Sequence, residues 1–358
     1  MTIIEARPTR PPALLPGGSL EADHQALRSN AAILDLSDVG FVHVGGAAAT
    51  AEVQALFTRD IEFLTPERSI TGLLLDSDGR PVDVVSCFMD ADGDGVVLRT
   101  GFGAGPTVVA HVRANVADNV SVTELDVSAL GIEGPYAWSA IGEVLDPDLA
   151  SLPFEAVLPI TWEDHELVFS RTGVTGEYGY QLSGSHEAIA ALRERFGASA
   201  EPVGRGVVEL AMLEVRQPLL ARELVDGAGV IEAGLQWLVD ITKPAFLGRE
   251  ALLASLDEAT SATIGGQLDD PGGLDDAGSS ADLLDGAEVV VGDEVIGHVV
   301  WAAQSPSRGA TVALSRVRPE LAASGLALAV RLADGRVLPY TTLSSPYVIP
   351  ASWSVPIL

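Results

Sequence analysis

Apolar residues recur with a helical period in some short segments of the chain and with a strand period in others. In residues 20–29, Leu20, His24 and Leu27 fall on one face of a predicted helix, and Ser19 can cap its first turn. The same period predicts further helices over residues 47–57, 105–116, 186–197, 205–215 and 246–258. Apolar and polar residues alternate in the segments predicted as strands, at residues 31–46, 93–102, 120–134, 165–173 and 179–184.

Turn residues divide these elements and mark a change near the C-terminus. A β-hairpin is predicted over residues 69–90, with residues 76–79 (DSDG) as its turn. A strand at Trp237 is predicted to lead through a tight turn into the last helix. Residues 265–280 are acidic and rich in glycine, which predicts a loop or domain junction. From Ala287 onward, short Val-rich strands predict a small antiparallel barrel, so the chain as a whole is expected to be α+β.

The composition is that of a folded protein with a large core. Of the 358 residues, 47% are hydrophobic and 20% are charged, which allows two or three domains. The single cysteine, Cys87, excludes an internal disulfide framework, and its apolar neighbours predict a buried, unreactive thiol. No apolar run reaches the roughly 18–20 residues of a membrane span, and the N-terminus lacks the pattern of a signal peptide. We therefore expect a cytoplasmic protein.

The charge is strongly negative. Fifty acidic residues face 21 basic ones, which gives a net charge of −29, and Lys243 is the only lysine. Such a surface repels phosphate backbones and anionic lipids, so neither nucleic acid nor a membrane is expected as a partner. The simplest interpretation of the charge is solubility, with an acidic recognition surface as the alternative.

Metal-binding and common catalytic motifs are missing from the sequence. It contains no phosphate-binding GxxxxGK[ST], no HExxH and no GxSxG motif. No two histidines are spaced three or four residues apart, as the ligands of a helical metal site would be, so no metal is expected. They are His24, His43, His111, His165, His186 and His298. His43 alternates along a predicted strand, where we expect it to be packed or solvated.

A glycine-rich segment with one carboxylate is the first candidate for chemistry. In residues 172–180 (TGVTGEYGY), three glycines allow a sharp turn that presents Glu177. A carboxylate in that position can accept two N–H donors from a planar heterocycle. The alternative is a glycine-rich hairpin whose Glu177 points to water.

Asp83 in the hairpin is the second candidate. A carboxylate between Val82 and Val84 could have a raised pKa and act as a base or an electrostatic stabiliser. Alternation along the strand, however, places Asp83 on the face opposite to these two valines. An outward-facing strand residue is therefore the favoured alternative.

Seven segments follow one another along the chain from His24 nearly to the C-terminus: HQALRSNAAILDLSDVG, ALFTRDIEFLTPE, GRPVD, GIEGPYA, TGVTGEYGYQL, LQWLVDITKPAFLGREAL and SPSRGATVALSRV. Together they resemble the aminomethyltransferase (T-protein) family of the glycine cleavage system and its folate-dependent demethylase relatives. The resemblance implies a three-domain ring around a central funnel that holds tetrahydrofolate, with a C-terminal antiparallel β-barrel. It also implies domains formed by residues 1–50 with 128–235, by 51–127 with 236–257, and by 258–358.

The resemblance further implies a function and a set of site residues. It implies a one-carbon transferase that moves a methyl or aminomethyl group from a small methylated substrate to tetrahydrofolate. By the resemblance, Glu177 would hold the pterin ring, with Tyr180, Trp237 and Glu223 lining the funnel. Asp83 is the candidate catalytic carboxylate. A lipoyl carrier protein is not expected as a partner, because no basic surface for an acidic carrier is evident.

The sequence departs from the family pattern at the site itself. The family places its catalytic aspartate five residues after the hairpin glycine, where this chain has Val84. In the family register Val84 enters the funnel and Asp83 points away, unless a bulge near Pro81 rotates the strand. Two family arginines correspond to Val208 and Met212. A folate-independent enzyme on the same fold and a non-catalytic binding protein therefore stay open as alternatives.

Overall fold

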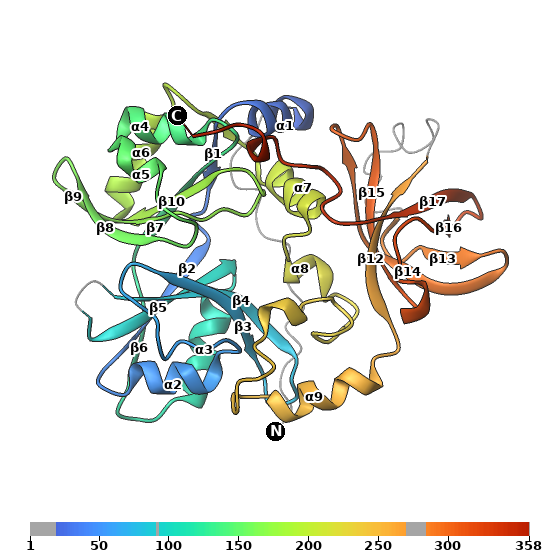
Figure 1. Ribbon diagram of the computed structural model, residues 1–358, viewed down its shortest axis with the longest axis horizontal. Coiled ribbons are helices and arrows are strands. Elements are labelled where there is room, and N and C mark those ends of the chain that lie inside the picture. The colour runs from blue at the N-terminus through green and yellow to red at the C-terminus, as the bar shows by residue number, and fades with distance from the viewer. Residues whose placement is uncertain (1–18, 91–92, 270–283, 358) are drawn as a thin grey trace.

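The computed structural model describes residues 19–90, 93–269 and 284–357, which form two sheets and a barrel joined by helices (Figure 1). The two sheets lie one above the other, and the barrel lies beside them. The C-terminal segment leaves the barrel and returns to the first sheet, so that the last described residues lie near α4. Within the described residues, no helix is both long and apolar enough to cross a membrane.

The first sheet has six described strands in the order β11, β1, β7, β10, β9, β8, of which β1 and β11 pair in parallel and the others antiparallel. The strands are β1 (Ala32–Asp35), β7 (Ser128–Glu133), β8 (Val157–Trp162), β9 (His165–Ser170), β10 (Gly179–Gly184) and β11 (Glu201–Val203). Its helices are α1 (Leu20–Ser29), α4 (Ala137–Val144), α5 (Pro147–Ala150), α6 (His186–Phe196) and α7 (Arg205–Val215). Apolar side chains of α4, α6 and the strands form one buried cluster, which covers one face of this sheet.

The second sheet is antiparallel, with five strands among the described residues, in the order β3, β4, β5, β2, β6. The strands are β2 (Val39–Gly45), β3 (Ser69–Leu75), β4 (Pro81–Met89), β5 (Gly95–Phe102) and β6 (Ser121–Glu124). Two helices, α2 (Ala49–Leu56) and α3 (Gly105–Asn115), supply buried residues to the core on one face of this sheet. The predicted turn is confirmed: Gly79 donates its N–H to the carbonyl of Asp76 and has a φ of +74°. Cys87 is fully buried in this core, as predicted, and burial raises its pKa to about 12.

The only lysine of the chain joins a distant loop to the end of α2. The Nζ of Lys243 donates to the backbone carbonyl oxygens of Gln54, Phe57 and Arg59, at 2.6, 2.7 and 2.9 Å. Carbonyl groups at the end of a helix lack helical partners, so the ammonium group supplies the missing donors. The loop around Lys243 is thereby held against the second sheet, just before α9 (Arg249–Glu258).

The C-terminal barrel is closed and antiparallel, in the order β12, β15, β14, β13, β16, β17. Its strands are β12 (Ala262–Leu268), β13 (Glu288–Val291), β14 (Glu294–Ser305), β15 (Ala310–Val317), β16 (Ala327–Arg331) and β17 (Val337–Leu343). The short helices η2 (Pro319–Leu321) and η3 (Ala351–Trp353) follow β15 and β17 respectively. The predicted α+β class with a C-terminal antiparallel barrel is confirmed.

Two predicted local structures are wrong. Residues 265–268, predicted as part of a loop, belong to β12, while residues 270–280 of that loop lie outside the described residues. The glycines there serve packing, because a Cβ on Gly265 would overlap the ring of Tyr347 and one on Gly266 the ring of Tyr340. At Trp237 the chain forms the single turn η1 (Gln236–Leu238) instead of a strand, because Leu238 packs into the core beside β3.

The predicted division into domains stays a prediction, although the sheets bear on one boundary. Strand β2, which precedes the boundary predicted at residue 50, pairs with β5 and β6 of the second sheet. The short helix α8 (Leu220–Glu223) and the loops around η1 pack against β3 through a separate apolar cluster.

Candidate functional site

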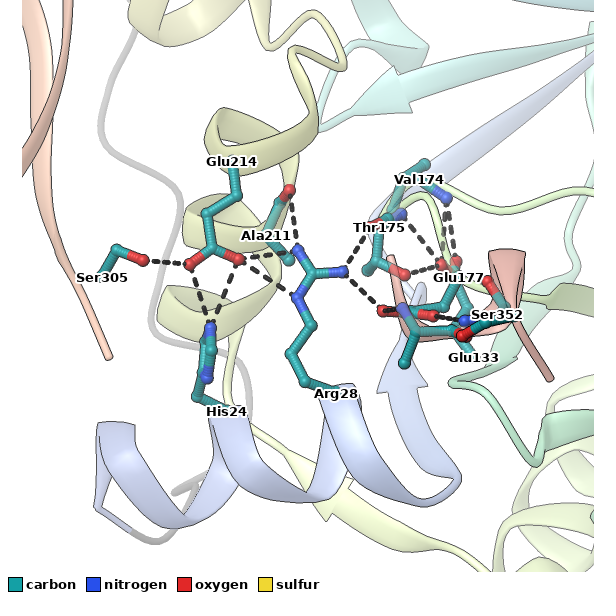
Figure 2. A network of polar contacts seen from close by, with 12 residues as sticks. His24, Arg28, Glu133, Val174, Thr175, Glu177, Ala211, Glu214, Ser305 and Ser352 are labelled. Carbon is teal, nitrogen blue, oxygen red and sulfur yellow. Dashed lines mark hydrogen bonds and ion pairs between the residues drawn. The ribbon is translucent and has the colours of Figure 1, made fainter. Parts of the chain in front are cut away.

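A buried polar network joins α1, α7, the glycine-rich turn before β10 and the C-terminal segment (Figure 2). His24 and Arg28 lie four residues apart, so they share one face of α1. Both reach Glu214 on α7: the His24 Nε2 lies 3.0 Å from one carboxylate oxygen, and the Arg28 Nη2 donates to the other at 2.7 Å. The same guanidinium donates through Nη1 to Glu177 at 3.0 Å and to the carbonyl of Thr175 at 2.8 Å.

Glu177 is buried and fully engaged by the chain itself. Gly176 precedes it with a φ of +79°, which favours glycine and allows the sharp turn. Besides Arg28, the carboxylate accepts the backbone N–H groups of Ala351 at 3.1 Å and Ser352 at 2.9 Å, and its side chain has no exposed surface. The two parallel N–H donors expected from a planar heterocycle are therefore supplied here by the C-terminal segment. The predicted alternative of a water-facing Glu177 is wrong.

Two further buried glutamates of the network differ in their electrostatics. Burial raises the pKa of Glu133, although the hydroxyl of Thr175 and the N–H groups of Val174 and Thr175 lower it in part. Burial also acts on Glu214, but the hydrogen bond from His24 and the charge of Arg28 outweigh it and hold its pKa below the usual range. Ser305 of the barrel also donates to Glu214, at 2.6 Å, and so ties the barrel to α7.

Two cavities border the C-terminal segment. The larger, of about 440 Å³, is lined by Glu177, Arg171, Phe154 and Trp353, among others. A second cavity, of about 350 Å³, is lined by residues of α1 and by Val348, Ile349 and Ala351 of the C-terminal segment. Cavities of a few hundred cubic ångströms are typical of small-molecule sites. The larger one is the better candidate here because Glu177 lines it.

Asp83 is buried on the face of β4 that carries Val85 and Cys87 into the core under α2 and α3. The favoured alternative, an outward-facing strand residue, is therefore wrong, because helices cover this face of the sheet. Its Oδ2 accepts the N–H of Gly101 at 2.8 Å, and a Cβ on Gly101 would lie 2.7 Å from Oδ1. Burial raises the pKa of Asp83 to about 7, although the N–H groups of Gly101 and Val84 lower it in part. A carboxyl with that pKa can exchange a proton at neutral pH.

Strand β4 contains a bulge near Pro81. Leu74 pairs with Asp83 while Leu75 pairs with Pro81, so one extra residue lies on β4 between them. Downstream of the bulge, Val84 is half-buried and packs on the apolar cluster beneath α8 and η1. Asp83 and Val84 therefore point to opposite faces of the sheet.

The other predicted site residues are not gathered around Glu177. The ring of Tyr180 is fully buried beside Phe169, and its hydroxyl donates to the carbonyl of Ala150 at 2.9 Å. Glu223 is buried in an ion pair with Arg216 at 2.8 Å, and burial raises its pKa against the opposing charge of that arginine. Trp237 is half-exposed on η1. Of the five predicted residues, Glu177 alone lines the larger cavity.

Comparison with known proteins identifies the fold and the family. Residues 16–243 match the GCVT N-terminal domain, and residues 274–348 match the glycine cleavage T-protein C-terminal barrel domain. The chain belongs to the aminomethyltransferase (T-protein) family. An aminomethyltransferase of Geobacillus kaustophilus is 28% identical over 329 residues, covering 89% of this chain and 88% of the relative. That of Cupriavidus metallidurans is 29% identical over 353 residues, covering 92% and 90%.

A solved structure of the family has the same fold. The glycine cleavage system aminomethyltransferase T from Bartonella henselae superposes with a TM-score of 0.81 at 21% identity. The match covers 92% of this chain and 90% of that one. This structure confirms the predicted fold, and the two domain matches confirm the predicted family.

The positions where this chain departs from the family pattern are apolar in the structure as well. Val208 and Met212, at the places of two family arginines, are both buried in the core between α1, α7 and the sheets.

A different arginine lies between the two sheets. Arg99 on β5 donates to Gln181 on β10 at 2.5 Å and to Ser86 on β4 at 2.9 Å.

Arg99 is a residue that the sequence reasoning missed. Burial lowers its pKa to about 10, and among the described residues it forms no ion pair with a carboxylate. Its signal in the sequence was a lone arginine inside the apolar strand GVVLRTGF. The contact with Gln181 is what joins the faces of the two sheets at this point.

Among the described residues, one group has ligands close enough together to hold a metal ion. The ligand atoms of His43, Asp90 and Asp94 lie within 4.8 Å of one another at the partly exposed end of β2. The His43 Nε2 lies 2.7 Å from Asp90, and the two side chains form a partly buried contact. This group lies in the second sheet, apart from the network around Glu177.

Proposed function

We propose that the chain is a one-carbon transferase that uses tetrahydrofolate and acts on a small methylated substrate through a remodelled site. The observation that carries the proposal is the match to relatives named aminomethyltransferases over nearly nine-tenths of both chains. The group transferred would be a methyl or aminomethyl carbon on nitrogen, oxygen or sulfur.

We assign the proton transfer of this reaction to Asp83. Transfer of a one-carbon unit to an amine nitrogen requires that nitrogen to lose a proton, and a carboxyl with a pKa of about 7 can accept one at neutral pH. Val84, one residue later, carries no such group. The bulge opposite Leu75 is a place where a small shift of β4 would turn the carboxyl toward the opposite face.

We assign pterin binding to Glu177, and we keep Trp237, an exposed ring on η1, as a second candidate contact for the cofactor. A pterin ring would take the place of the Ala351 and Ser352 N–H donors, so cofactor binding requires the C-terminal segment to move away. Tyr180 and Glu223 are each held by the chain's own groups, so we assign them to the support of the site walls.

A specific observation favours a second candidate, an enzyme or binding protein of this fold that does not use folate. The two arginines expected to meet the folate glutamate are replaced by buried Val208 and Met212. Each lost charge-assisted contact weakens binding by roughly 1.5–3 kcal/mol. Glu177, in addition, is already satisfied by internal bonds.

Titration of the purified chain with tetrahydrofolate, followed by a transfer assay with methylated amines, ethers and thioethers, separates the two candidates. We expect measurable transfer and a loss of about 100-fold or more in Asp83→Asn, the typical contribution of a positioned acid–base group. Asp164→Asn, at an exposed turn, is the matched control and should be unchanged.

Val84→Asp tests whether a carboxylate at the position of the family's catalytic aspartate can still take part in the transfer. Higher transfer in Val84→Asp would mean that the natural protein carries a weakened form of the step. Unchanged transfer in Asp83→Asn would remove Asp83 from the mechanism. Absence of both folate binding and transfer would favour the folate-independent candidate.

A further inference from the structure

Arg171 is a buried cation that pairs with no carboxylate among the described residues. It follows β9, is 8% exposed, and donates through Nη1 to the carbonyl of Gly179 at 2.7 Å. Its guanidinium carbon lies 5.3 Å from the ring centre of Tyr178 and 4.4 Å from that of Tyr180. Within the described part of the chain, its Nε finds no hydrogen-bond acceptor. A buried charge with an unused donor is costly, and an anion that reaches the guanidinium would lower that cost.

Arg171 forms part of the wall of the larger cavity, where two aromatic side chains are exposed. Phe154, from the loop before β8, is 61% exposed, and Trp353, from η3, is 68% exposed. These residues come from distant parts of the chain and line the same cavity of about 440 Å³. Exposed aromatic faces around one polar anchor are typical of pockets that bind flat ligands.

The charge of this cavity differs from that of the rest of the molecule. Glu177 also lines it, but its carboxylate is fully buried and accepts hydrogen bonds from Arg28 and from two backbone N–H groups. Arg171 is therefore a cation in the cavity wall without an ion-pair partner among the described residues, in a protein whose net charge is −29. A surface this acidic repels anions in general. A buried arginine in a cavity wall therefore indicates that this cavity binds a particular anion.

We propose that this cavity binds a small aromatic carboxylate. The carboxylate accepts hydrogen bonds from the guanidinium of Arg171, and the ring lies against Phe154 and Trp353. A charge-assisted contact to a planar guanidinium supplies orientation, and the two rings supply apolar area. This binding requires the C-terminal segment in its docked position, with Trp353 in the wall, so it does not depend on the displacement of that segment that pterin binding at Glu177 requires.

Calorimetric titration of the full chain with 2-naphthoate tests the proposal, with neutral 2-naphthamide and ring-free acetate as comparison ligands. We expect naphthoate to bind about tenfold or more tightly than either, since it alone has both the charge and the ring. Arg171→Met should weaken naphthoate by a similar factor, and Arg171→Lys by less. Arg336→Met, on an exposed turn of the barrel, should bind naphthoate as the wild type does.

Trp353→Ala keeps the test decisive if Arg171 variants fold poorly, because this ring is mostly exposed. It should weaken naphthoate several-fold and leave acetate unchanged. Equal binding of naphthoate and naphthamide would overturn the assignment of Arg171. Unchanged naphthoate affinity in Trp353→Ala would overturn the placement in this cavity. Neither result bears on whether the chain transfers a one-carbon group.

Discussion

Among the residues of this chain, the donors around a buried carboxylate decide its charge. Glu214 is buried but receives hydrogen bonds from His24, Arg28 and Ser305, and its pKa is held below the usual range. Asp83 is also buried, but its hydrogen bond at 2.8 Å comes from a backbone N–H, that of Gly101, and its pKa rises to about 7. Burial favours the neutral acid, and only several donors or a cation reverse that preference.

The stability of the protein should depend on pH through Asp83. Its pKa is about 7 in the folded chain and near the ordinary value of 3.8 when unfolded, so the folded state holds the proton more tightly. Its contribution to stability is complete below about pH 4 and is lost as the pH rises through about 7, by about 1.4 kcal/mol for each pH unit between the two pKa values. Urea unfolding at pH 5, 6, 7 and 8 should therefore show a smaller decline for Asp83→Asn than for the wild type.

Asp164→Asn is the control for this experiment, because Asp164 is an exposed carboxylate on a turn. Its unfolding free energy should follow the wild type at every pH. Other buried acids with raised pKa values, such as Glu133 and Glu223, contribute equally to all three proteins and cancel in the difference. Parallel curves for Asp83→Asn and the wild type would contradict the raised pKa.

Among the elements, the C-terminal segment after β17 makes its hydrogen bonds with α7 and with the turn before β10 of the first sheet, and not only with the barrel. The N–H groups of Tyr347 and Val348 donate to the carbonyl of Glu214, at 2.7 and 3.1 Å. The N–H groups of Ala351 and Ser352 donate to Glu177. This segment forms walls of both cavities, so its docking determines whether they exist.

Removing the carboxylate of Glu177 should loosen η3 without unfolding the barrel. In Glu177→Ala, two backbone N–H groups lose their acceptor and Arg28 loses one of its acceptors, and amide exchange of residues 346–357 should accelerate by about tenfold or more. Glu177→Gln keeps one acceptor oxygen and should have a smaller effect. The measurement is hydrogen exchange by mass spectrometry, peptide by peptide.

The barrel strands provide an internal control for that measurement, and Glu288→Gln is a matched variant in an exposed ion pair with Arg331. Exchange in residues 346–357 should be unchanged in Glu288→Gln. Uniform acceleration over the whole chain in Glu177→Ala would mean that the network supports global stability instead of the docking of one segment.

In the whole molecule, ion pairs and hydrogen bonds hold the barrel against α7 and the segment after α8, although the protein as a whole is strongly negative. Arg316 of β15 bonds to Asp226 at 2.9 Å and to the carbonyl of Glu223 at 2.6 Å, near the end of α8. Ser305 of β14 reaches Glu214 in the network of Figure 2. These contacts act against the repulsion of a net charge of −29.

Salt should stabilise this protein. Between 0.05 and 0.5 M NaCl the screening length falls from roughly 14 to about 4 Å, so repulsion among surface carboxylates weakens while the buried Arg28–Glu214 pair is little affected. We expect the melting temperature to rise by a few degrees and then level off. A melting temperature that falls with salt would contradict this expectation. A rise that continues linearly to 2 M would indicate exclusion of salt from the surface instead of screening.

Local patterns in the sequence determined most of the elements and the family of this protein. The helices at residues 20–29 and 205–215, the hairpin turn at Gly79 and the Val-rich barrel follow from periods and turn residues that act within a few positions. The seven segments in order determined the family for the same reason, since each is a short run of neighbouring residues. These features depend on residues that lie within a few positions of one another, so the sequence is sufficient to predict them.

Tertiary structure alone decided where the candidate side chains point. Glu177 was expected to meet a heterocycle, but its N–H donors come from 174 and 175 residues away. The orientation of Asp83 depends on one extra residue in β4, and Gly265 lies in a strand because a tyrosine ring packs against it. Contacts of this kind form between residues that are distant along the chain. They depend on how whole elements pack, and no local period or spacing encodes that.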